Sequence, residues 1–520
     1  MIDTKKEQER DELHRAIWAI ADELRGAVDG WDFKNYVLGT MFYRYISENL
    51  RNYINSGEID AGNSDFDFAK MPDEDAEEAR EGLVEEKGFF ILPSELFCNV
   101  RANAENDENL NETLERVFRH IEESAKGSEA ESDFAGLFDD YDVNSNKLGS
   151  TVAKRNEKLV KLLNGVGEMN LGDVIDHSID AFGDAYEYLM TMYASNAGKS
   201  GGEFFTPADV SELLTRLGTV GKTEINKVYD PACGSGSLLL KAEKILGKDA
   251  IRNGFYGQEI NITTYNLCRI NMFLHDVGFD KFNIACEDTL LSPQHWDDEP
   301  FELIVSNPPY SIKWAGDENP LLINDPRFAP AGVLAPKSKA DMAFIMHSLS
   351  WLASNGTAAI VCFPGIMYRG GAEQKIRKYL VDNNYVDCVI QLPSNLFFGT
   401  SIATCIMVMK KNKTDNKTLF IDATSECVKV TNNNKLTPEN IDRIVDMFAK
   451  REEEEHFAHL ASYEEVSGND YNLSVSTYVE AEDTREKIDI VKLNAEIKEI
   501  VAREQVLRDE IDKIIAEIEV

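Results

Sequence analysis

The sequence predicts an α/β protein: a mostly parallel sheet covered by helices on both faces, with a helical region before it and a long helix after it. From about residue 175, short β-branched and aromatic runs alternate with helical segments. Residues 1–170 show mainly helical periodicity, and the last forty residues carry a regular apolar repeat. We therefore expect a helical N-terminal accessory domain over 1–172, an α/β domain over 173–480 and a C-terminal helix over 481–520.

The helical prediction for the first domain rests on apolar residues spaced three or four apart. These sets are Leu13, Ile17, Ile20 and Leu24, then Val37, Met41 and Tyr45, and then Leu114, Val117 and Ile121. No group of residues typical of catalysis stands out in this region, so we expect it to have an accessory role.

Seven short runs are the predicted strands of the sheet: residues 227–229, 254–257, 303–306, 357–363, 387–392, 404–409 and 419–421. In sheets of this kind, ligands bind at the carboxyl ends of the parallel strands. The motifs described below follow such strand ends, so one edge of the sheet is expected to carry the functional site.

The net charge is −38, from 54 basic and 92 acidic residues. Residues 1–150 alone hold about 16 Lys and Arg against about 36 Asp and Glu. A protein that binds nucleic acid by itself usually has a basic surface, because Lys and Arg replace the counterions of the phosphates. The acidic balance therefore indicates either a surface that favours solubility or a protein for which another chain supplies any affinity for nucleic acid.

The eight cysteines are scattered between Cys98 and Cys427, with no C-x-x-C pair and no histidine cluster beside them. Disulfides and a metal site are therefore not expected. The N-terminus is charged and has no apolar signal segment. No apolar run approaches the roughly 20 residues of a membrane span. These features predict a cytoplasmic protein that does not bind membranes.

Residues 229–237 read Tyr-Asp-Pro-Ala-Cys-Gly-Ser-Gly-Ser and connect a predicted strand to a predicted helix. A glycine-rich turn at this place lets a ligand approach the backbone closely. The spacing differs from the dinucleotide motif G-x-G-x-x-G, since Leu239 stands at the third glycine position. The carboxylate of Asp230 would repel a pyrophosphate but would bind an ammonium, which favours a methionine-type ligand. The predicted contacts are Asp230, Gly234, Ser235, Gly236 and Ser237.

Two further acids follow later strand ends. Glu259 comes about 23 residues after Gly236, at a place where an acid typically binds ribose hydroxyls. Asp288 follows a third strand and is placed to accept a hydrogen bond from an adenine amino group. Each acid alone would be interpreted as a solvated loop residue, but their ordered succession after a glycine loop favours an adenosine-containing ligand.

Upstream, residues 201–207 read Gly-Gly-Glu-Phe-Phe-Thr-Pro. The glycines give the chain conformational freedom, and the two aromatic residues offer a stacking surface. Thr206 and Pro207 are predicted to start a helix, with Thr206 as its cap and Pro207 in its first position.

Residues 306–310 read Ser-Asn-Pro-Pro-Tyr and close a predicted strand. The amide oxygen of Asn307 and the carbonyl of Pro308 can both accept hydrogen bonds from one exocyclic NH2 group, because the prolines stiffen the turn and remove backbone donors. Two acceptors localise the nitrogen lone pair, so a weakly nucleophilic amino group can attack a methyl group. Tyr310 offers a flat face for a planar substrate. A base inside a duplex must be flipped out to reach such a pocket.

With these motifs in this order, the chain resembles the amino-methylating DNA methyltransferases whose catalytic motif is N-P-P-Y. It resembles more closely the modification subunit of type I restriction–modification systems. The resemblance covers nearly the whole chain: a helical domain of this length, a G-x-x-F-T-P-like segment, a D-P-A-x-G-type loop and a helical tail. It implies a Rossmann-like class I methyltransferase core that transfers a methyl group from S-adenosyl-L-methionine to adenine N6 in DNA. Cys233, Ser235 and Ser237 depart from the Ala, Thr and Gly common in relatives, although all three are small.

The resemblance also implies roles for single residues. The implied cofactor contacts are Glu203, Phe204, Phe205, Thr206, Pro207, Ala208, Ser235, Gly236, Ser237 and Glu259. The clamp on the amino group is implied at Asn307, Pro308 and Tyr310, and an aromatic residue behind the flipped base is expected at Phe397 or Phe398. Transfer would be direct, so Cys233 is not expected to act as a nucleophile.

The same resemblance implies that a separate specificity subunit chooses the sequence in double-stranded DNA, and that a restriction subunit with nuclease and translocase activity completes the complex. After Met409, only about seventy residues precede the terminal helix, which leaves little room for a target-recognition domain. The apolar repeat of that helix predicts a partner helix, in another subunit or in a second copy of this chain, although it would also fit packing on its own body. The repeat comprises Ile490, Leu493, Ile497, Ile500, Leu507, Ile511, Ile514 and Ile518, with Glu504 as its one interruption.

Other functions fit parts of the sequence. The motif N-P-P-Y is also compatible with cytosine N4, with a self-sufficient adenine methyltransferase and with a methyltransferase acting on protein glutamine. An acidic protein that mimics DNA is a hypothesis of a different class, but such a protein would not need the loop at 230–237. The phosphate-binding motif G-x-x-x-x-G-K-[ST] is absent, so cleavage would belong to another subunit.

Overall fold

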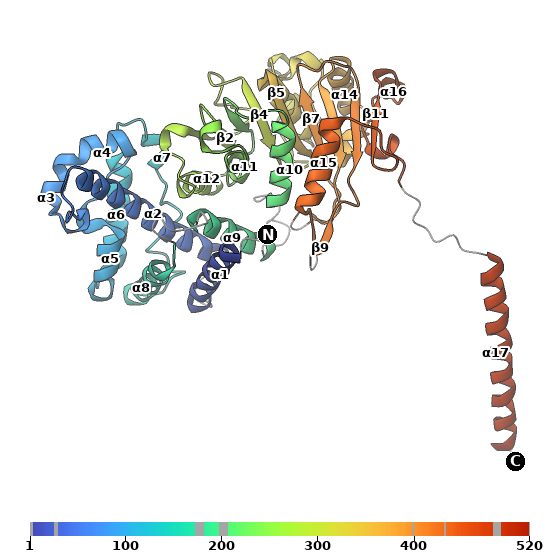
Figure 1. The fold of residues 1–520 in the computed structure, drawn as a ribbon, viewed down its shortest axis with the longest axis horizontal. Helices are drawn as coiled ribbons and strands as arrows, with labels where there is room; N and C mark the ends of the chain where they lie inside the picture. Colours follow the sequence, from blue (N-terminus) through green and yellow to red (C-terminus); the bar gives the residue numbers. More distant parts are fainter. Residues whose placement is uncertain are drawn as a thin grey trace. The chain divides into compact units, whose positions relative to one another are not determined.

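The computed structural model describes residues 4–24, 30–171, 181–196, 206–397, 400–430, 433–481 and 490–518. The chain forms two compact units, Met1–Val479 and Glu480–Val520. The first unit contains a group of N-terminal helices and a large sheet, and the second contains helix α17 (Ile490–Ile518) (Figure 1). The predicted fold class, α/β with a helical N-terminal region, is confirmed.

The N-terminal region is helical, as predicted, because its apolar residues lie on helix faces that pack together. Leu13, Ile17 and Ile20 on the first helix are buried, and so are Val37 and Met41 on the second. The helices are α1 (Thr4–Leu24), α2 (Gly30–Asp60), α3 (Asp73–Ala76), α4 (Arg80–Lys87), α5 (Phe97–Asn103), α6 (Leu110–Ser124), α7 (Glu131–Phe134), α8 (Val152–Glu168) and α9 (Ala181–Asn196).

The nine strands of the main sheet have the order β11-β8-β6-β7-β5-β4-β1-β2-β3. Strand β7 is antiparallel to both of its neighbours and β11 is antiparallel to β8, whereas the other neighbouring pairs are parallel. The strands are β1 (Val228–Asp230), β2 (Phe255–Glu259), β3 (Phe282–Cys286), β4 (Phe301–Ser306), β5 (Leu352–Cys362), β6 (Val386–Gln391), β7 (Cys405–Lys410), β8 (Thr418–Asp422) and β11 (Ala458–Ala461). A separate hairpin consists of β9 (Val428–Val430) and β10 (Asn433–Lys435).

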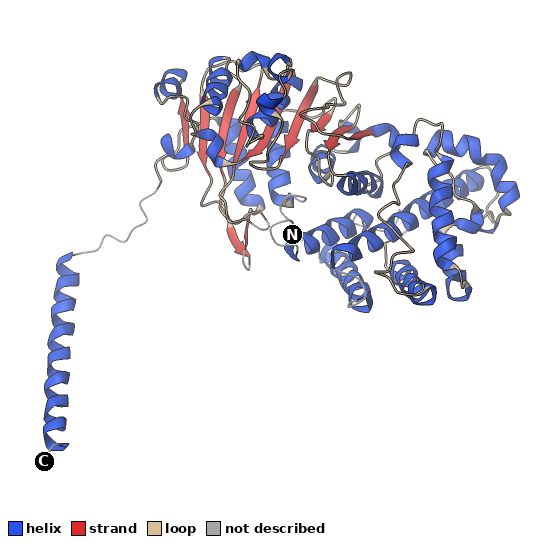
Figure 2. Ribbon diagram, turned by 180° about the vertical axis from the view of Figure 1, so that it is seen from behind, coloured by secondary structure: helices blue, strands red, loops and turns tan. Residues whose placement is uncertain are grey.

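Helices cover the sheet on both faces (Figure 2). Successive residues of β4 enter different cores: Leu303 and Val305 belong to one cluster, and Ile304 belongs to the other. The first cluster is shared with α10 (Ala208–Thr219), α11 (Ser237–Leu246), α12 (Ile262–Leu274) and α15 (Pro438–Lys450). The second is shared with α13 (Asp341–Trp351), α14 (Ala372–Asp382) and α16 (Tyr463–Gly468). Burial on both faces explains why these strands have nearly continuous apolar sequences.

Each of the seven predicted strands corresponds to an observed strand, with shifts of a few residues at the ends. Strands β3, β9, β10 and β11 were not among the seven predicted runs, although a strand before Asp288 was expected. The predicted helix start at residues 206–207 is wrong. Helix α10 begins at Ala208, Pro207 is its N-cap, and no side chain caps it. The hydroxyl of Thr206 has a different partner, described below.

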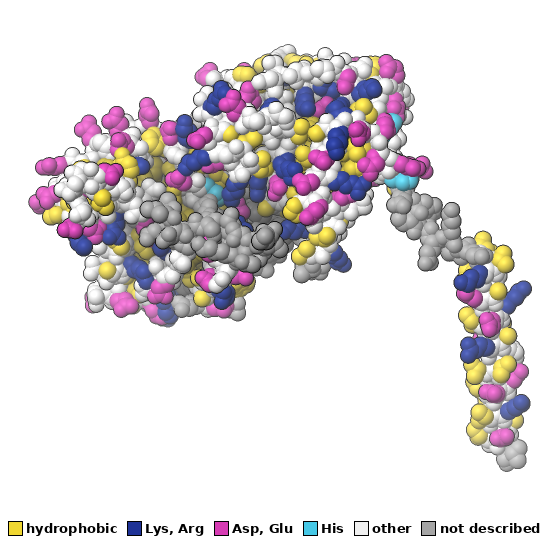
Figure 3. Space-filling model, in the orientation of Figure 1, with side chains coloured by type: hydrophobic (Ala, Val, Ile, Leu, Met, Phe, Trp, Pro, Cys, Tyr) yellow, Lys and Arg dark blue, Asp and Glu magenta, His cyan; other side chains and the backbone are white. Residues whose placement is uncertain are grey.

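Helix α17 exposes its whole apolar repeat within its own unit. The fractional exposure of Ile490 is 69%, that of Leu493 is 44% and that of Ile518 is 78%. Figure 3 shows hydrophobic side chains along the length of this helix, between charged ones. None of the helices in the described residues is long and apolar enough to cross a membrane.

The N-terminal helices are joined to the sheet region through a buried arginine on α12. The guanidinium of Arg269 is 1% exposed and donates hydrogen bonds to the carbonyls of Ser132, Asp133 and Ala135, at 2.8, 3.1 and 3.0 Å. These three residues belong to α7 and the turn after it. Because a buried carbonyl without a donor is costly, Arg269 is a principal polar link between the two regions.

Replacing Arg269 with Met should lower the midpoint of thermal unfolding by roughly 5 °C or more, because three carbonyls lose their buried donor. Differential scanning calorimetry of the full chain would measure this shift. As a control, Arg252→Met removes an exposed arginine that pairs with Glu224 on the surface, and it should leave the midpoint nearly unchanged. Equal shifts in the two variants would contradict this assignment.

Candidate functional site

Four neighbouring strands bring the predicted site residues to one edge of the sheet. Strands β4, β1, β2 and β3 are parallel neighbours, so their carboxyl ends lie side by side. Asp230 ends β1 and Glu259 ends β2, while Asn307 follows β4 directly and Asp288 follows β3 after one residue. The structure therefore places the glycine loop, both later acids and the N-P-P-Y motif at the same edge.

The glycine loop between β1 and α11 is shaped by two residues with left-handed backbone. Gly234 has φ of 53° and Gly236 has φ of 78°. A Cβ atom on Gly236 would also lie 2.7 Å from the sulfur of Cys268. Asn271 on α12 also fixes the loop, because its side-chain amide donates to the carbonyl of Ser235 at 2.8 Å. A side chain at Gly236 would therefore displace the loop from the sheet edge.

Asp230 is fully buried, and it connects the glycine loop to the strand that ends at the N-P-P-Y motif. Its Oδ1 accepts hydrogen bonds from the hydroxyl of Ser306 at 2.7 Å and from the amide of Ala232 at 3.0 Å. Its Oδ2 has no hydrogen-bond partner among the described residues. Burial raises the pKa of Asp230 to about 7, against the lowering effect of these two donors. A buried carboxylate oxygen left unpaired suits a cationic ligand group.

Glu259 lies across the loop from Asp230, and it also binds backbone donors. Its carboxylate accepts from the amide of Gly234 at 3.1 Å and from the amide of Asn261 at 2.9 Å. Burial raises its pKa above the ordinary value. The neighbouring side chains of Ile260 and Ile262 are 68% and 57% exposed. These two exposed apolar side chains beside Glu259 offer a surface for a flat ring, and sequence reasoning missed them.

The loop after β3 is held in place by a buried arginine that sequence reasoning also missed. Asp288 Oδ1 accepts from the amides of Leu290 and Leu291, at 2.9 and 3.2 Å. Behind this turn, Arg327 is 1% exposed and donates to the carbonyls of Thr289 and Leu290, at 2.8 Å each. No local sequence pattern could identify Arg327, because these partners are 38 and 37 residues away in the chain.

The N-P-P-Y motif forms a short chain of hydrogen bonds. The hydroxyl of Tyr310 donates to Oδ1 of Asn307 at 2.6 Å, and Nδ2 of Asn307 donates to the hydroxyl of Thr206 at 3.2 Å. Burial raises the pKa of Tyr310 well above its ordinary value, so the phenol remains protonated and can donate. Thr206 thereby fixes the orientation of the Asn307 amide, which replaces the capping role predicted from the sequence.

The remaining predicted residues have different positions. Pro207 and Ala208 stand at the start of α10, next to Thr206. Phe397 is 2% exposed and belongs to the first core cluster, so its ring is covered by other side chains in this structure. The predicted contacts that lie outside the described residues are Glu203, Phe204, Phe205 and Phe398.

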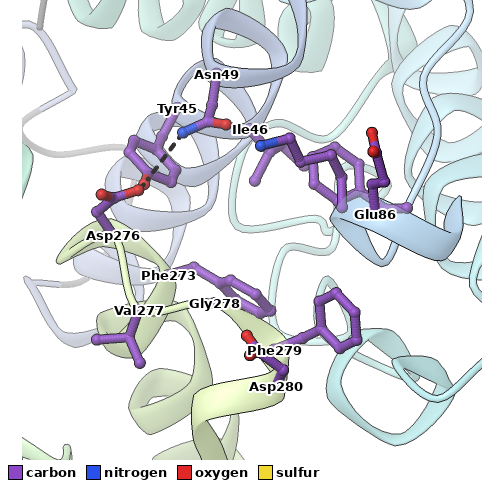
Figure 4. A pocket seen from close by; sticks show the side chains of 12 residues that line it. Tyr45, Ile46, Asn49, Glu86, Phe273, Asp276, Val277, Gly278, Phe279 and Asp280 are labelled. Carbon is purple, nitrogen blue, oxygen red and sulfur yellow. Dashed lines mark hydrogen bonds between the residues drawn. The ribbon is translucent and has the colours of Figure 1, made fainter. Parts of the chain in front are cut away.

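A cavity of about 260 Å³ lies away from this edge, between the N-terminal helices and the chain after α12 (Figure 4). Tyr45 and Asn49 of α2 face Asp276 across it, and the Tyr45 hydroxyl donates to Asp276 at 3.2 Å. None of the predicted site residues lines this cavity, so it is separate from the site at the sheet edge. In the described part of the chain, no group of His, Cys, Asp and Glu could hold a metal ion.

The sheet order and the motifs at its edge are those of a Rossmann-like methyltransferase that carries an N-P-P-Y motif. A family model described as N-6 DNA Methylase matches residues 177–487, and one described as HsdM N-terminal domain matches residues 13–166. The methylase subunit of the type I restriction enzyme MpnII from Mycoplasma pneumoniae is 50% identical over 537 residues, which cover 100% of this chain and 98% of that protein.

Solved structures give the same result. The type I restriction–modification methyltransferase subunit from Streptococcus thermophilus matches with a TM-score of 0.82 at 36% identity, covering 91% of this chain and 100% of that chain. A chain from a structural study of complex assembly in the type I restriction–modification system shares the fold, with a TM-score of 0.65 at 18% identity over 98% of this chain and 99% of that chain. This chain belongs to the N-6 DNA methylase family, among the methylase subunits of type I restriction enzymes.

This membership confirms the predicted class of enzyme, an adenine-N6 DNA methyltransferase of a restriction–modification system. It argues against the hypotheses of a protein-glutamine methyltransferase and of a DNA mimic. The family implies a reaction that depends on S-adenosylmethionine.

The raised pKa of Asp230 predicts a pH-dependent stability difference in the ligand-free chain. Between its ordinary pKa, about 4, and about 7, the folded protein holds a proton that the unfolded chain has released. The contribution of this group to stability therefore falls as the pH rises through that window. Asp230→Asn removes this titration. The gain in the midpoint of thermal unfolding, variant minus wild type, should therefore be larger at pH 8 than at pH 5. Calorimetry at both pH values measures the difference, and a gain that is larger at pH 5 would contradict the prediction.

Proposed function

We propose that this edge of the sheet binds S-adenosyl-L-methionine and a flipped adenine, and that the residues act as their sequence motifs imply. The observation that carries the proposal is the Ser306–Asp230 hydrogen bond of 2.7 Å, because it joins the acid of the glycine loop to the residue before Asn307. A ligand bound at the loop would therefore lie beside the amino-group clamp.

In the cofactor site, S-adenosyl-L-methionine supplies a methyl group activated on a sulfonium. The unpaired Oδ2 of Asp230 is available for its ammonium group. Glu259 binds the ribose hydroxyls, and Asp288 accepts from the adenine amino group. Ile260 covers one face of the adenine ring with its exposed side chain. Gly234, Ser235, Gly236 and Ser237 let the ligand approach the backbone. The family motif implies further cofactor contacts from Glu203 to Ala208, including Phe204 and Phe205.

In the catalytic site, Asn307 Oδ1 and the carbonyl of Pro308 accept the two N6 hydrogens of the flipped adenine. Tyr310 stacks on the base with its ring. Phe397 or Phe398 is the candidate for the other face, and Phe397 would have to leave the core cluster that covers its ring. The Tyr310 hydroxyl occupies Asn307 Oδ1 in this structure, so the base displaces that hydrogen bond when it enters. The chain contributes positioning and polarisation, and no covalent enzyme intermediate is required.

Asn307→Ala should reduce methyl transfer to DNA by about 100-fold or more, because one acceptor for the amino group is lost. The affinity for S-adenosyl-L-methionine, measured by calorimetry, should change little. Tyr310→Phe keeps the stacking ring and frees Asn307 Oδ1, so it should retain transfer within about tenfold of the wild type. Unchanged transfer in Asn307→Ala, measured with a labelled methyl donor, would refute the proposed role.

We further propose that the chain acts as one subunit of a complex, organised as a helical accessory domain over 1–172, a catalytic domain over 173–480 and an association helix over 481–520. A specificity subunit supplies the target sequence in double-stranded DNA, and a restriction subunit and a second copy of this chain complete the assembly. Two observations support this arrangement: the net charge of −38 and the exposed apolar repeat of α17.

Substitution of the repeat tests this arrangement. Ile497→Asp together with Ile500→Asp should abolish co-purification with the specificity subunit, because two charges would enter a helix–helix contact. The matched control Lys498→Ser with Glu499→Ser changes neighbouring exposed positions and should preserve co-purification. Both double variants should keep the wild-type midpoint of thermal unfolding. Normal co-purification of the aspartate variant would rule out α17 as the helix that binds the specificity subunit.

A further inference from the structure

The residue that follows the catalytic tyrosine is held by a buried carboxylate from another element. Asp341 is the first residue of α13 and is 6% exposed. Its two oxygens accept from the backbone amide of Ser311, at 3.2 Å for Oδ1 and 3.0 Å for Oδ2. Ser311 comes directly after Tyr310, so the side chain of Asp341 contacts the backbone of the catalytic loop.

The backbone at Ser311 needs such support. Its φ is 52°, in the left-handed region that residues with a Cβ atom rarely adopt. A serine there is strained relative to an ordinary conformation unless its surroundings favour it. The charge-assisted hydrogen bond from the Ser311 amide to Asp341 favours this conformation.

Two further backbone hydrogen bonds fix the same loop to the chain before α13. The amide of Ala340 donates to the carbonyl of Ile312 at 2.9 Å, and the amide of Trp314 donates to the carbonyl of Lys337 at 3.0 Å. Helix α13 is itself anchored in the sheet, where Nε2 of His347 is 2.8 Å from the hydroxyl of Tyr229. The loop after Tyr310 is therefore attached to a rigid element.

Burial and the groups around Asp341 influence the pKa of its carboxyl in opposite directions. Burial raises the pKa of its carboxyl, and the Ser311 amide, Arg369 and Lys339 act in the opposite direction. A second buried acid, Glu373, also faces Arg369, with 3.6 Å between its Oε1 and Nη1 of the arginine.

We propose that Asp341 is a positioning residue for the catalytic loop. It stabilises the left-handed turn at Ser311 and so sets the direction in which Tyr310 presents its ring and Asn307 its amide oxygen. This inference rests on the proposed function of Asn307 and Tyr310, and adds a residue that lies in no part of the N-P-P-Y motif.

The test uses the full chain together with its specificity subunit on unmethylated genomic DNA. Asp341→Ala should lower the single-turnover rate of methyl transfer by about tenfold or more, because small displacements of a catalytic group are costly. Its dissociation constant for S-adenosyl-L-methionine should stay within about threefold of the wild type. Asp341→Asn, which keeps one acceptor oxygen and is a milder change to the fold, should give an intermediate rate.

A second substitution separates positioning from stability. Ser311→Gly removes the strain of the left-handed turn, so the double variant Asp341→Ala with Ser311→Gly should transfer at least about threefold faster than Asp341→Ala alone. The control is Glu302→Ala, which removes a carboxylate that accepts from the amide of Asn226 at 2.6 Å, at the other end of β4. This control should lower thermal stability without lowering the transfer rate.

Wild-type transfer by Asp341→Ala would overturn the inference. A parallel loss of cofactor affinity and of rate, without recovery in the glycine double variant, would also overturn it, since Asp341 would then support only the fold. The wild-type rate in the same assay reports separately on the proposed function.

Discussion

The site depends on the parallel pairing of β1 with β4, which brings two distant parts of the chain to one edge of the sheet. Tyr229 pairs with Ile304, so Asp230 and Ser306 end their strands together, and their side chains form a buried hydrogen bond. The glycine loop extends from one strand and the N-P-P-Y turn from the other. The strand pairing alone thereby places any ligand held by the loop next to the turn.

Burial makes the carboxylate of Asp230 unfavourable in the free protein, and this favours the binding of a cationic group. A carboxylate with one oxygen unpaired and a pKa of about 7 is unfavourable in the absence of a ligand. The same feature favours a positively charged group once it arrives. The Tyr310 hydroxyl donates to the amide oxygen of Asn307 in the free protein, and in our proposal the amino group of the substrate replaces it there.

The motifs and the fold were predictable from the sequence because each depends on local patterns. Alternating strands and helices, the glycine spacing and N-P-P-Y are all contained in short stretches. The contacts that support these motifs were not predictable, since Arg327, Asp341 and Arg269 act on residues far away in the chain. Thr206 shows the same limit: its local sequence resembles a helix cap, but its hydroxyl binds Asn307, 101 residues away.

Methylation of adenine N6 at this edge of the sheet is tested most directly by mass spectrometry of nucleosides. The chain and its specificity subunit would first act on unmethylated DNA with an isotopically labelled methyl donor. We expect label in N6-methyladenine, and no label in that nucleoside when Asn307 is replaced by Ala. Label in N4-methylcytosine, or in protein and not in DNA, would contradict the proposed chemistry.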